Sequence, residues 1–371
     1  MASNVYFIKA SVDDGEKLIS RKARKLFKTG NLAKCFEEND FTAIKIHIGE
    51  EGNTTYIKAP CLKALVDELL ALKTKPFLTD TNALYVGRRH NAIDHASLAA
   101  EHGFSKDVLG IPFIVADGLL GTSETAVQID GQINKEVFIA SDLVRCQSML
   151  SVAHFTGHPA ACAAATLKTL GMGCASKRGK MAQHAALTLS ITDDCTLCGQ
   201  CFTHCPAEAI TLDDVKGTPP AKRPARKPKA RIDQDKCISC AQCLAVCRFD
   251  AVKCNWGNET ETLQKSIAEH ALGVLKGKKD KAAFFNFLIS ITEDCDCFDT
   301  PNMPKMVDDI GILASTDPVA VDKAALDLVE KKAGKEFAKL LGNEQLDSRC
   351  QIEHAQRIGL GSTTYKLIEV R

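Results

Sequence analysis

Three features that direct a chain to a membrane or to nucleic acid are missing from this sequence. Its apolar runs fall short of the roughly 18–20 residues that a membrane-spanning helix needs. The first residues, Met1–Lys17, contain no apolar core of a signal peptide. The 47 lysines and arginines nearly balance the 46 aspartates and glutamates, which leaves a net charge of +1 and no general attraction to polyanions. We therefore expect a cytoplasmic protein that binds neither membrane nor nucleic acid.

Cysteine, in contrast, is abundant, with 17 among 371 residues. In a secreted protein this number would indicate disulfides, whereas in a long intracellular chain it indicates metal binding in a reducing environment. Apolar residues make up 45% of the chain and charged residues 25%, as expected for a packed core. The length fits two or three domains, or one large α/β unit with an insertion.

Eight of the cysteines form two copies of one motif. The spacing C-x2-C-x2-C-x3-C begins at Cys195 and again at Cys237. Three closely spaced thiolates bind one face of an iron–sulfur cube, and the fourth cysteine reaches the other cube. The sequence therefore predicts two [4Fe–4S] clusters, one bound by Cys195, Cys198, Cys201 and Cys247, the other by Cys237, Cys240, Cys243 and Cys205. A pair of zinc sites is the alternative, because zinc also binds four thiolates.

The segment between the two motifs is basic and rich in proline. Residues 215–231 contain four prolines and seven lysines or arginines, without a hydrophobic period. This composition predicts an exposed, extended loop. The alternative is a docking patch for an acidic redox partner, such as a ferredoxin or a flavodoxin, through electrostatic steering.

Outside the motif region, apolar runs typical of strands alternate with segments typical of helices. "FTAIKIHI", "PFLTD", "SMLSVAHF" and "AAFFNFLISI" are predicted strands. The alternation predicts an α/β fold, with a mostly parallel sheet covered by helices. Because it resumes after the motifs, we predict a host domain made of residues 1–190 and 255–371, interrupted at 191–254 by a bacterial-type dicluster ferredoxin domain.

Polar and thiol side chains stand where the predicted strands end, and this is where ligands bind in open α/β sheets. The residues at these ends are Lys45, His47, Asp80, Asp117, His154, His158, Cys295, Cys297, Ser315 and Thr316. Any one of them alone is explained as a cap or turn residue. Their convergence predicts a site, with Asp80 and Asp117 as cofactor-binding residues.

The stretch "KTLGMGCASKRGKMAQH" is rich in glycine and basic residues. Gly171 and Gly173, with Lys168 and Lys180, are predicted to form a nest for a phosphate or carboxylate. A tight basic turn is the alternative, and neither a Walker A nor a dinucleotide-binding spacing is present. We predict that the lysines hold a small anion and that a histidine, His154 or His184, moves a proton.

The pair Cys295 and Cys297 is separated by one residue, so in a strand both thiols point the same way. Such a pair binds a soft metal, forms a redox disulfide or contacts substrate. Two structural thiols are the alternative.

The sequence resembles the iron–sulfur-centre proteins of the "domain of unknown function 362" family. The matching stretches include "KIHIGEEGNTTYIKAP", "AHFTGH", "LKTLGMGCASKRGKMAQH", the double cysteine motif and "DCDCFD". The resemblance implies an α/β host with an inserted two-cluster ferredoxin, usually in anaerobes. A fainter resemblance, to nickel-pincer lactate racemases, rests on the order of His154, Lys168 and His184.

Together these features predict an iron–sulfur oxidoreductase. Electrons would pass through two [4Fe–4S] clusters to a small anionic substrate, or to a further metal or anionic cofactor, at the strand ends. The predicted catalytic residues are His154, His184, Lys168, Cys295 and Cys297. The alternatives are a non-enzymatic electron carrier, and a metal- or nucleotide-cofactor enzyme with structural clusters.

Overall fold

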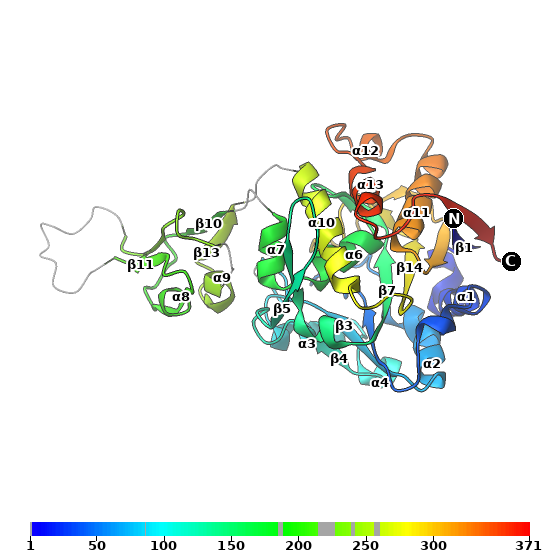
Figure 1. The fold of residues 1–371 in the computed structure, drawn as a ribbon, viewed down its shortest axis with the longest axis horizontal. Helices are drawn as coiled ribbons and strands as arrows, with labels where there is room; N and C mark the ends of the chain where they lie inside the picture. The colour runs from blue at the N-terminus through cyan, green and yellow to red at the C-terminus, as the bar shows by residue number, and fades with distance from the viewer. Residues whose placement is uncertain (1, 86, 185–187, 214–226, 239–241, 256–259) are drawn as a thin grey trace, which may run out of the picture.

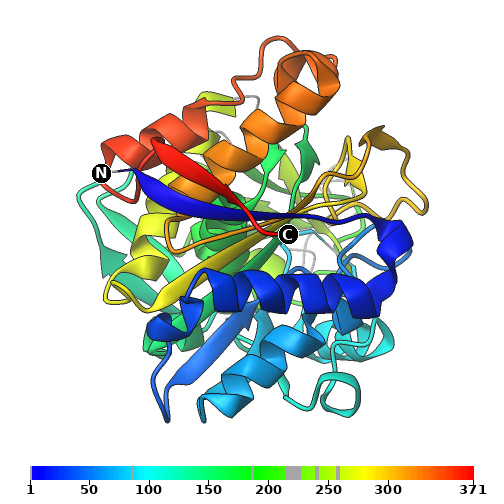
Figure 2. The same cartoon turned by 90° about the vertical axis from the view of Figure 1, so that its right-hand side faces the viewer.

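The host part of the chain is built on one eight-stranded sheet, seen in Figures 1 and 2. The computed structural model describes residues 2–85, 87–184, 188–213, 227–238, 242–255 and 260–371. In spatial order the strands are β18 (Tyr365–Glu369), β1 (Ser3–Lys9), β17 (Gly311–Ser315), β14 (Ala282–Leu288), β7 (Ser148–His154), β2 (Phe41–Lys45), β3 (Lys75–Asp80) and β4 (Phe113–Val115).

The sheet is mostly parallel, which confirms the predicted fold class. Only β17 runs against its neighbours in this sheet, since it pairs antiparallel with both β1 and β14. Ser315 and Thr316 therefore lie at the opposite edge from the ends of the parallel strands. Their predicted place in the site is wrong, and Ser315 instead donates to the carbonyl of Asn4 at 2.8 Å.

Helices cover both faces of the sheet (Figure 2). One face packs against α1 (Gly15–Thr29), α2 (Lys63–Ala71), α3 (Ala92–Glu101) and α4 (Lys106–Leu109). The other packs against α5 (Ser141–Arg145), α6 (Thr166–Cys174), α10 (Thr260–Leu275), α11 (Pro318–Ala333), α12 (Phe337–Leu340) and α13 (Cys350–Arg357). Among the described residues, the 3-10 turns are η1 (Val12–Asp14), η2 (Leu32–Cys35) and η3 (Ala59–Leu62).

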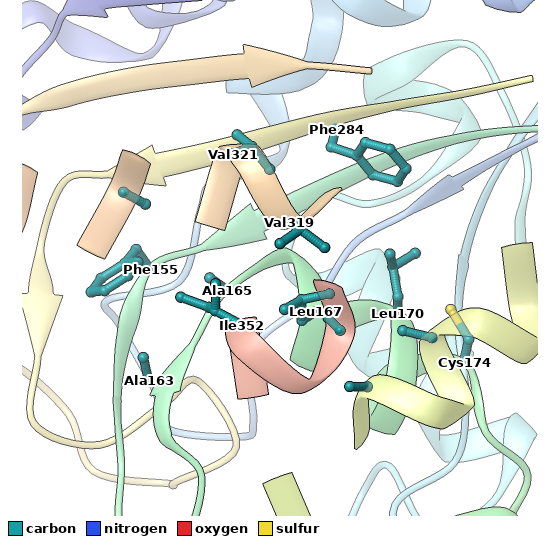
Figure 3. Packing of buried hydrophobic residues seen from close by; sticks show 14 of the residues in the cluster. Phe155, Ala163, Ala165, Leu167, Leu170, Cys174, Phe284, Val319, Val321 and Ile352 are labelled. Carbon is teal, nitrogen blue, oxygen red and sulfur yellow. The ribbon is translucent and has the colours of Figure 1, made fainter. Parts of the chain in front are cut away.

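Strand β14 shows why the sheet is central. All seven of its side chains are buried, as expected for a strand covered on both faces. Phe284 points into the α11 side and Phe285 into the α1 side, following the two-residue period of a strand. Figure 3 shows Val319 of α11 between Phe284 and Leu167 of α6.

In the described part of the host, three two-stranded antiparallel sheets lie outside the central sheet. They are β5 (Glu124–Gln128) with β6 (Glu136–Ala140), β8 (Thr156–His158) with β9 (Cys162–Ala164), and β15 (Ile291–Thr292) with β16 (Lys305–Val307).

The cysteine motifs lie in a smaller body beside α7 (Lys177–Gln183), at the far end from both termini (Figure 1). Its elements are β10 (Thr188–Ile191), α8 (Gln200–Thr203), β11 (Ile210–Leu212), β12 (Ala230–Ile232), α9 (Gln242–Val246) and β13 (Val252–Asn255). β10 pairs with β13 and β11 with β12, both antiparallel. We call this body the cysteine unit; its assignment as a ferredoxin domain stays a prediction, as do the domain boundaries.

Of the basic segment 215–231, residues 215–226 lie outside the described residues. In the parts of the chain that the structure describes, no helix is long and apolar enough to cross a membrane.

Candidate functional site

The parallel strands β2, β3, β7 and β14 end at one edge of the sheet, and the thiol pair lies there. Cys295 and Cys297 follow β15 in a tight turn, in which the backbone N–H of Phe298 donates to the carbonyl of Cys295 at 3.1 Å. The expected strand conformation is therefore wrong. The two thiols nevertheless lie close enough to shift each other's pKa, which is raised for Cys295 and lowered for Cys297. Cys295 is buried, whereas Cys297 is partly exposed.

Four contacts from distant segments hold this turn in place. The backbone N–H of Glu50 donates to the carbonyl of Asp296 at 2.9 Å, and Asn53 Nδ2 donates to the carbonyl of Phe298 at 3.0 Å. The hydroxyl of Tyr85 donates to the carbonyl of Cys297 at 3.1 Å. The fourth contact is the ion pair between Asp296 and His154. A turn fixed from several sides gives its thiols a set direction.

His47 supplies a hydrogen bond to the sulfur of Cys297. The backbone N–H of Gly49 donates to Nδ1 of His47 at 3.0 Å, so the ring proton lies on Nε2. Nε2 is 3.3 Å from Sγ of Cys297 and donates to it. The loop after β2, "HIGEEGN", thus both supports the turn and contacts its thiol.

Lys168, on the first turn of α6, faces the other sulfur. Its Nζ lies 3.4 Å from Sγ of Cys295, and the lysine is buried. Burial alone would lower the pKa of Lys168, but Cys295 and Cys297 raise it above the ordinary value. The pKa of Cys297 is well below its usual range, because the Cys295 thiol donates to it and because Lys168 and His47 lie nearby. Donation to Cys297 correspondingly raises the pKa of Cys295. Of the two thiols, Cys297 is therefore the one that loses its proton more readily.

His154 anchors the turn rather than facing the thiols. Its Nε2 lies 2.7 Å from the carbonyl of Ile289, and its Nδ1 lies 3.0 Å from the carboxylate of Asp296. Burial disfavours the charged ring, but the carboxylate of Asp296 more than offsets this effect and raises the pKa of His154. Burial likewise opposes the Asp296 carboxylate, whose pKa His154 lowers. The predicted catalytic role of His154 therefore becomes a positioning role in our proposal.

His158 and His184 both have lowered pKa values, and the charge of Lys168 contributes to each shift. Backbone N–H groups of Ala160 and Ala161 donate to Nδ1 of His158. Burial, followed by the charge of Lys168, lowers the pKa of His158 well below its ordinary value, with Cys297 opposing the shift. The same two causes lower the pKa of His184 to about 4. The ring of His184 is therefore neutral at pH 7, and its place in one site with Lys168 and Cys297 stays a prediction.

A buried network lies behind Cys297. Arg89 donates from Nε to Glu50 at 3.0 Å and from Nη1 to Asp80 at 3.3 Å, and it also contacts the hydroxyl of Tyr85. Asp80 accepts a further bond from Lys45 at 2.8 Å. Burial raises the pKa of Tyr85 well above its ordinary value and so keeps its proton available for Cys297. Tyr85 and Arg89 were not predicted; the only signal was the cluster "YVGRRH" just after a strand end.

Several predicted cofactor-binding residues have internal roles instead. Asp80 is bound by Lys45 and Arg89, and Asp117 accepts from the backbone N–H and side chain of Asn82 at 3.0 and 2.8 Å. Nζ of Lys180 donates to Thr81 Oγ1 at 2.6 Å and to the carbonyl of Ala175 at 2.5 Å. Asp80, Asp117 and Lys180 thus have partners within the host, and their role in binding a cofactor stays a prediction.

The predicted glycine nest is a helix. Gly171 and Gly173 lie within α6, so their amides belong to helical hydrogen bonding rather than to an open loop. A Cβ on Gly171 would come within 2.1 Å of the carbonyl of Ile267, and one on Gly173 within 2.9 Å of Lys45 Nζ. These glycines permit close packing, and that packing brings Lys168 to the thiols.

In the cysteine unit, the cysteines of the two motifs interleave around two hollows. The first hollow is lined by Cys195, Cys198, Cys201 and Cys247. The second is lined by Cys205, Cys237 and Cys243. Cys240 lies outside the described residues. Each hollow thus contains a cysteine from the other motif, as the predicted ligand sets require.

Backbone N–H groups point at these sulfurs. Leu197 donates to Cys195 Sγ at 3.4 Å, Ala230 donates to the same sulfur at 3.5 Å, and Ala209 donates to Cys205 Sγ at 3.3 Å. Hydrogen bonds to cluster sulfurs are one way in which proteins set cluster potentials. Within the described ranges, no group of three or more His, Cys, Asp or Glu side chains is arranged so that it could bind a single metal ion. Thiol-lined, apolar hollows with N–H···S contacts fit iron–sulfur clusters.

His90 connects the cysteine unit to the host. One ring nitrogen lies 3.3 Å from the carbonyl of Leu244, next to Cys243, and the other lies 3.1 Å from the carbonyl of Tyr85. Leu84 and Met181 of the host share an apolar cluster with Leu189 and Leu244. Since Tyr85 also contacts Cys297, a short chain of contacts joins the second hollow to the thiol pair.

Comparison with known proteins identifies the family. The family model described as "Domain of unknown function (DUF362)" matches residues 42–327, and the chain belongs to this family. The chain is also similar to NADH-quinone oxidoreductase subunit I 2 of Streptomyces coelicolor, with 33% identity over 84 residues, which is 21% of this chain and 42% of that protein. It therefore spans about two fifths of that relative. The lactate racemase apoprotein from Thermoanaerobacterium thermosaccharolyticum has 12% sequence identity and a TM-score of 0.35, over 75% of this chain and 56% of that chain.

Proposed function

We propose that the protein is an iron–sulfur oxidoreductase with its redox site at Cys295 and Cys297. The observation that carries the proposal is the interleaving of the two cysteine motifs around two hollows. The similarity to an NADH-quinone oxidoreductase subunit supports it. When bound, [4Fe–4S] clusters supply one-electron transfer.

The host residues would bind and prepare the reacting groups. Lys168 and His47 hold negative charge on the thiol pair, and His154 and Tyr85 orient the turn. The ammonium of Lys168 has three N–H donors, of which one contacts Cys295, so it also remains our candidate for a small anionic substrate. An electron carrier without a reaction of its own would not need this buried network, so the enzyme is the better explanation.

Paired cysteine substitutions test the cluster assignment. The protein purified without oxygen should contain about eight irons and show a broad brown absorption that dithionite bleaches. Cys195→Ser combined with Cys247→Ser removes two ligands of one cluster and should leave about four irons. Cys195→Ser combined with Cys205→Ser removes ligands from both clusters and should leave almost none.

The control is Cys35→Ser, a buried cysteine of η2 in the host, which should keep the full iron content. Four irons in the Cys195/Cys205 variant and none in the Cys195/Cys247 variant would show that each motif binds its own cluster. Stoichiometric zinc with no iron would contradict the proposal as a whole.

A further inference from the structure

We propose that Cys295 and Cys297 are a redox-active dithiol that reduces small disulfides, with Cys297 as the attacking thiolate and Cys295 as the resolving thiol. The proposal deepens the proposed function by naming a substrate class, and it rests on that function only for the source of electrons.

The positions of the two sulfurs match these two roles. Cys297 is partly exposed, which an attacking group needs, and Cys295 is buried directly beside it. The two cysteines stand two residues apart in one tight turn, so little movement separates the resolving thiol from its target. Thiol–disulfide exchange requires this arrangement of an accessible thiolate and an adjacent second thiol.

The charges around the pair indicate a thiolate rather than two structural thiols. A buried ammonium is costly unless an opposite charge compensates it. Nζ of Lys168 faces Cys295 at 3.4 Å, and Nε2–H of His47 donates to Cys297 at 3.3 Å. Two neutral structural thiols would need neither group. The donors instead stabilise one negative charge on the pair.

The exchange balances with these groups alone. Cys297 attacks one sulfur of a disulfide RSSR, and the first RS⁻ leaves as the mixed disulfide forms. Cys295 then attacks Sγ of Cys297 and closes the intramolecular disulfide. The second RS⁻ leaves, and the proton of Cys295 ends on one of the released thiols. Return to the starting pair, one thiolate and one thiol, takes two electrons, for which the proposed function names the cysteine unit as the source, and one proton from water.

Peptide-resolved labelling of the full chain tests the dithiol. Protein kept free of oxygen is equilibrated with dithiothreitol buffers of varied reduced-to-oxidised ratio, quenched in acid and labelled with N-ethylmaleimide. As the buffer becomes more oxidising, the peptide that contains Cys295 and Cys297 should change from two labels to none in one step. The step should follow a two-electron couple, for which a tenfold change in the buffer ratio corresponds to about 30 mV. Two labels at every ratio, including oxidised dithiothreitol alone, would overturn the proposal.

Oxidised glutathione then separates the two roles. In Cys295→Ser the attack on glutathione stops halfway, so one glutathione should remain on Cys297. In Cys297→Ser the buried Cys295 should stay unmodified. His47→Ala and Lys168→Met should slow the reaction about tenfold or more, as loss of a charge-assisted hydrogen bond predicts. The control Cys61→Ser, a buried cysteine of η3, should react like the natural chain.

Iron measured on the same samples keeps the two proposals apart. If the Cys295–Cys297 peptide changes between two labels and none in protein that contains no iron, this inference is supported and the proposed function is contradicted. Full iron with an inert Cys295–Cys297 peptide would do the reverse. A stoichiometric metal ion lost on Cys297→Ser would overturn the dithiol, because a metal site would then explain the thiols.

Discussion

At the scale of single residues, the ion pair between His154 and Asp296 determines where the thiol turn sits. His154 ends β7, a strand at the centre of the sheet, whereas Asp296 lies between the two cysteines. Both groups are buried, so the pair is little screened by salt. Removing one partner would leave the other charge buried without compensation, which is more costly than removing both.

The pKa shifts of this pair predict how stability depends on pH. The pKa of His154 is raised above 6.5, so its contribution is complete below pH 6.5 and is lost as the pH rises through the folded-state value. Asp296 acts in the opposite direction, since its lowered pKa means that its contribution is lost only in acid, below 3.8. The stability lost by His154→Gln should therefore be larger at pH 6 than at pH 9, by about 1.4 kcal/mol per unit of pKa shift.

Thermal unfolding of the unmodified protein and of His154→Gln, each at pH 6 and at pH 9, measures this difference. Asp296→Asn provides a second check, because the Asp296 carboxylate makes the largest contribution that raises the pKa of His154. That variant should lose the same pH dependence. An equal effect of His154→Gln at pH 6 and pH 9 would mean that the ring is not charged in the folded protein.

At the scale of elements, helix α6 explains which part of the site the sequence predicts and which it does not. Lys168 and Cys295 were predicted as site residues, and they meet. Gly171 and Gly173 were interpreted as a loop because glycine is a poor helix former. Tertiary packing overrides that preference here, since only a residue without Cβ fits against Ile267 of α10. Sequence composition reports the local preference and not the neighbouring helix.

The same limit applies to strand direction and to long-range partners. Apolar runs such as "AAFFNFLISI" identify buried strands well, but they say nothing of direction, and so the reversal of β17 was missed. Tyr85 contacts Cys297 across 212 residues of sequence, and Arg89 contacts Glu50 across 39. Only the fold brings such residues together. Cysteine spacing was more informative because the cluster chemistry itself fixes it.

Close packing of α6 on α10 gives a prediction at this scale. Gly171→Ala places a methyl group 2.1 Å from the carbonyl of Ile267, so the helices must separate. Overpacking of this kind should lower the free energy of unfolding by about 1–3 kcal/mol. Because Lys168 lies one turn earlier on α6, labelling of Cys297 should also slow. Denaturant unfolding and alkylation rates measure the two effects.

Thr169→Ala is the matched control, since it changes the same helix and adds no atoms. It should alter stability by no more than about 0.5 kcal/mol. If Gly171→Ala is equally mild, then α6 has room to move and the close approach is not what positions Lys168.

At the scale of the whole molecule, the chain path divides the host around the cysteine unit. β10 enters the unit and β13 leaves it, and the two pair with Ile191 opposite Val252. The backbone N–H of Thr192 donates to the carbonyl of Ala251 at 2.8 Å, so the two connections are adjacent. An insertion whose ends meet in one hairpin can be removed without stretching the host.

Excision of Thr192–Ala251 with an Asn-Gly turn in its place tests this division. Two-residue Asn-Gly turns suit antiparallel hairpins, so β10 and β13 should still pair. We expect a host that melts cooperatively, only a few degrees lower because Leu84 and Met181 become exposed, and that contains no iron. Its Cys295–Cys297 peptide should still take up and lose two labels.

Residues 1–190 alone should not fold cooperatively, because this fragment lacks β14, β17 and β18. Without these strands, β1 loses both of its neighbours and β7 loses one of its two. Cooperative melting of that fragment, followed by circular dichroism, would show instead that the first 190 residues form a domain of their own.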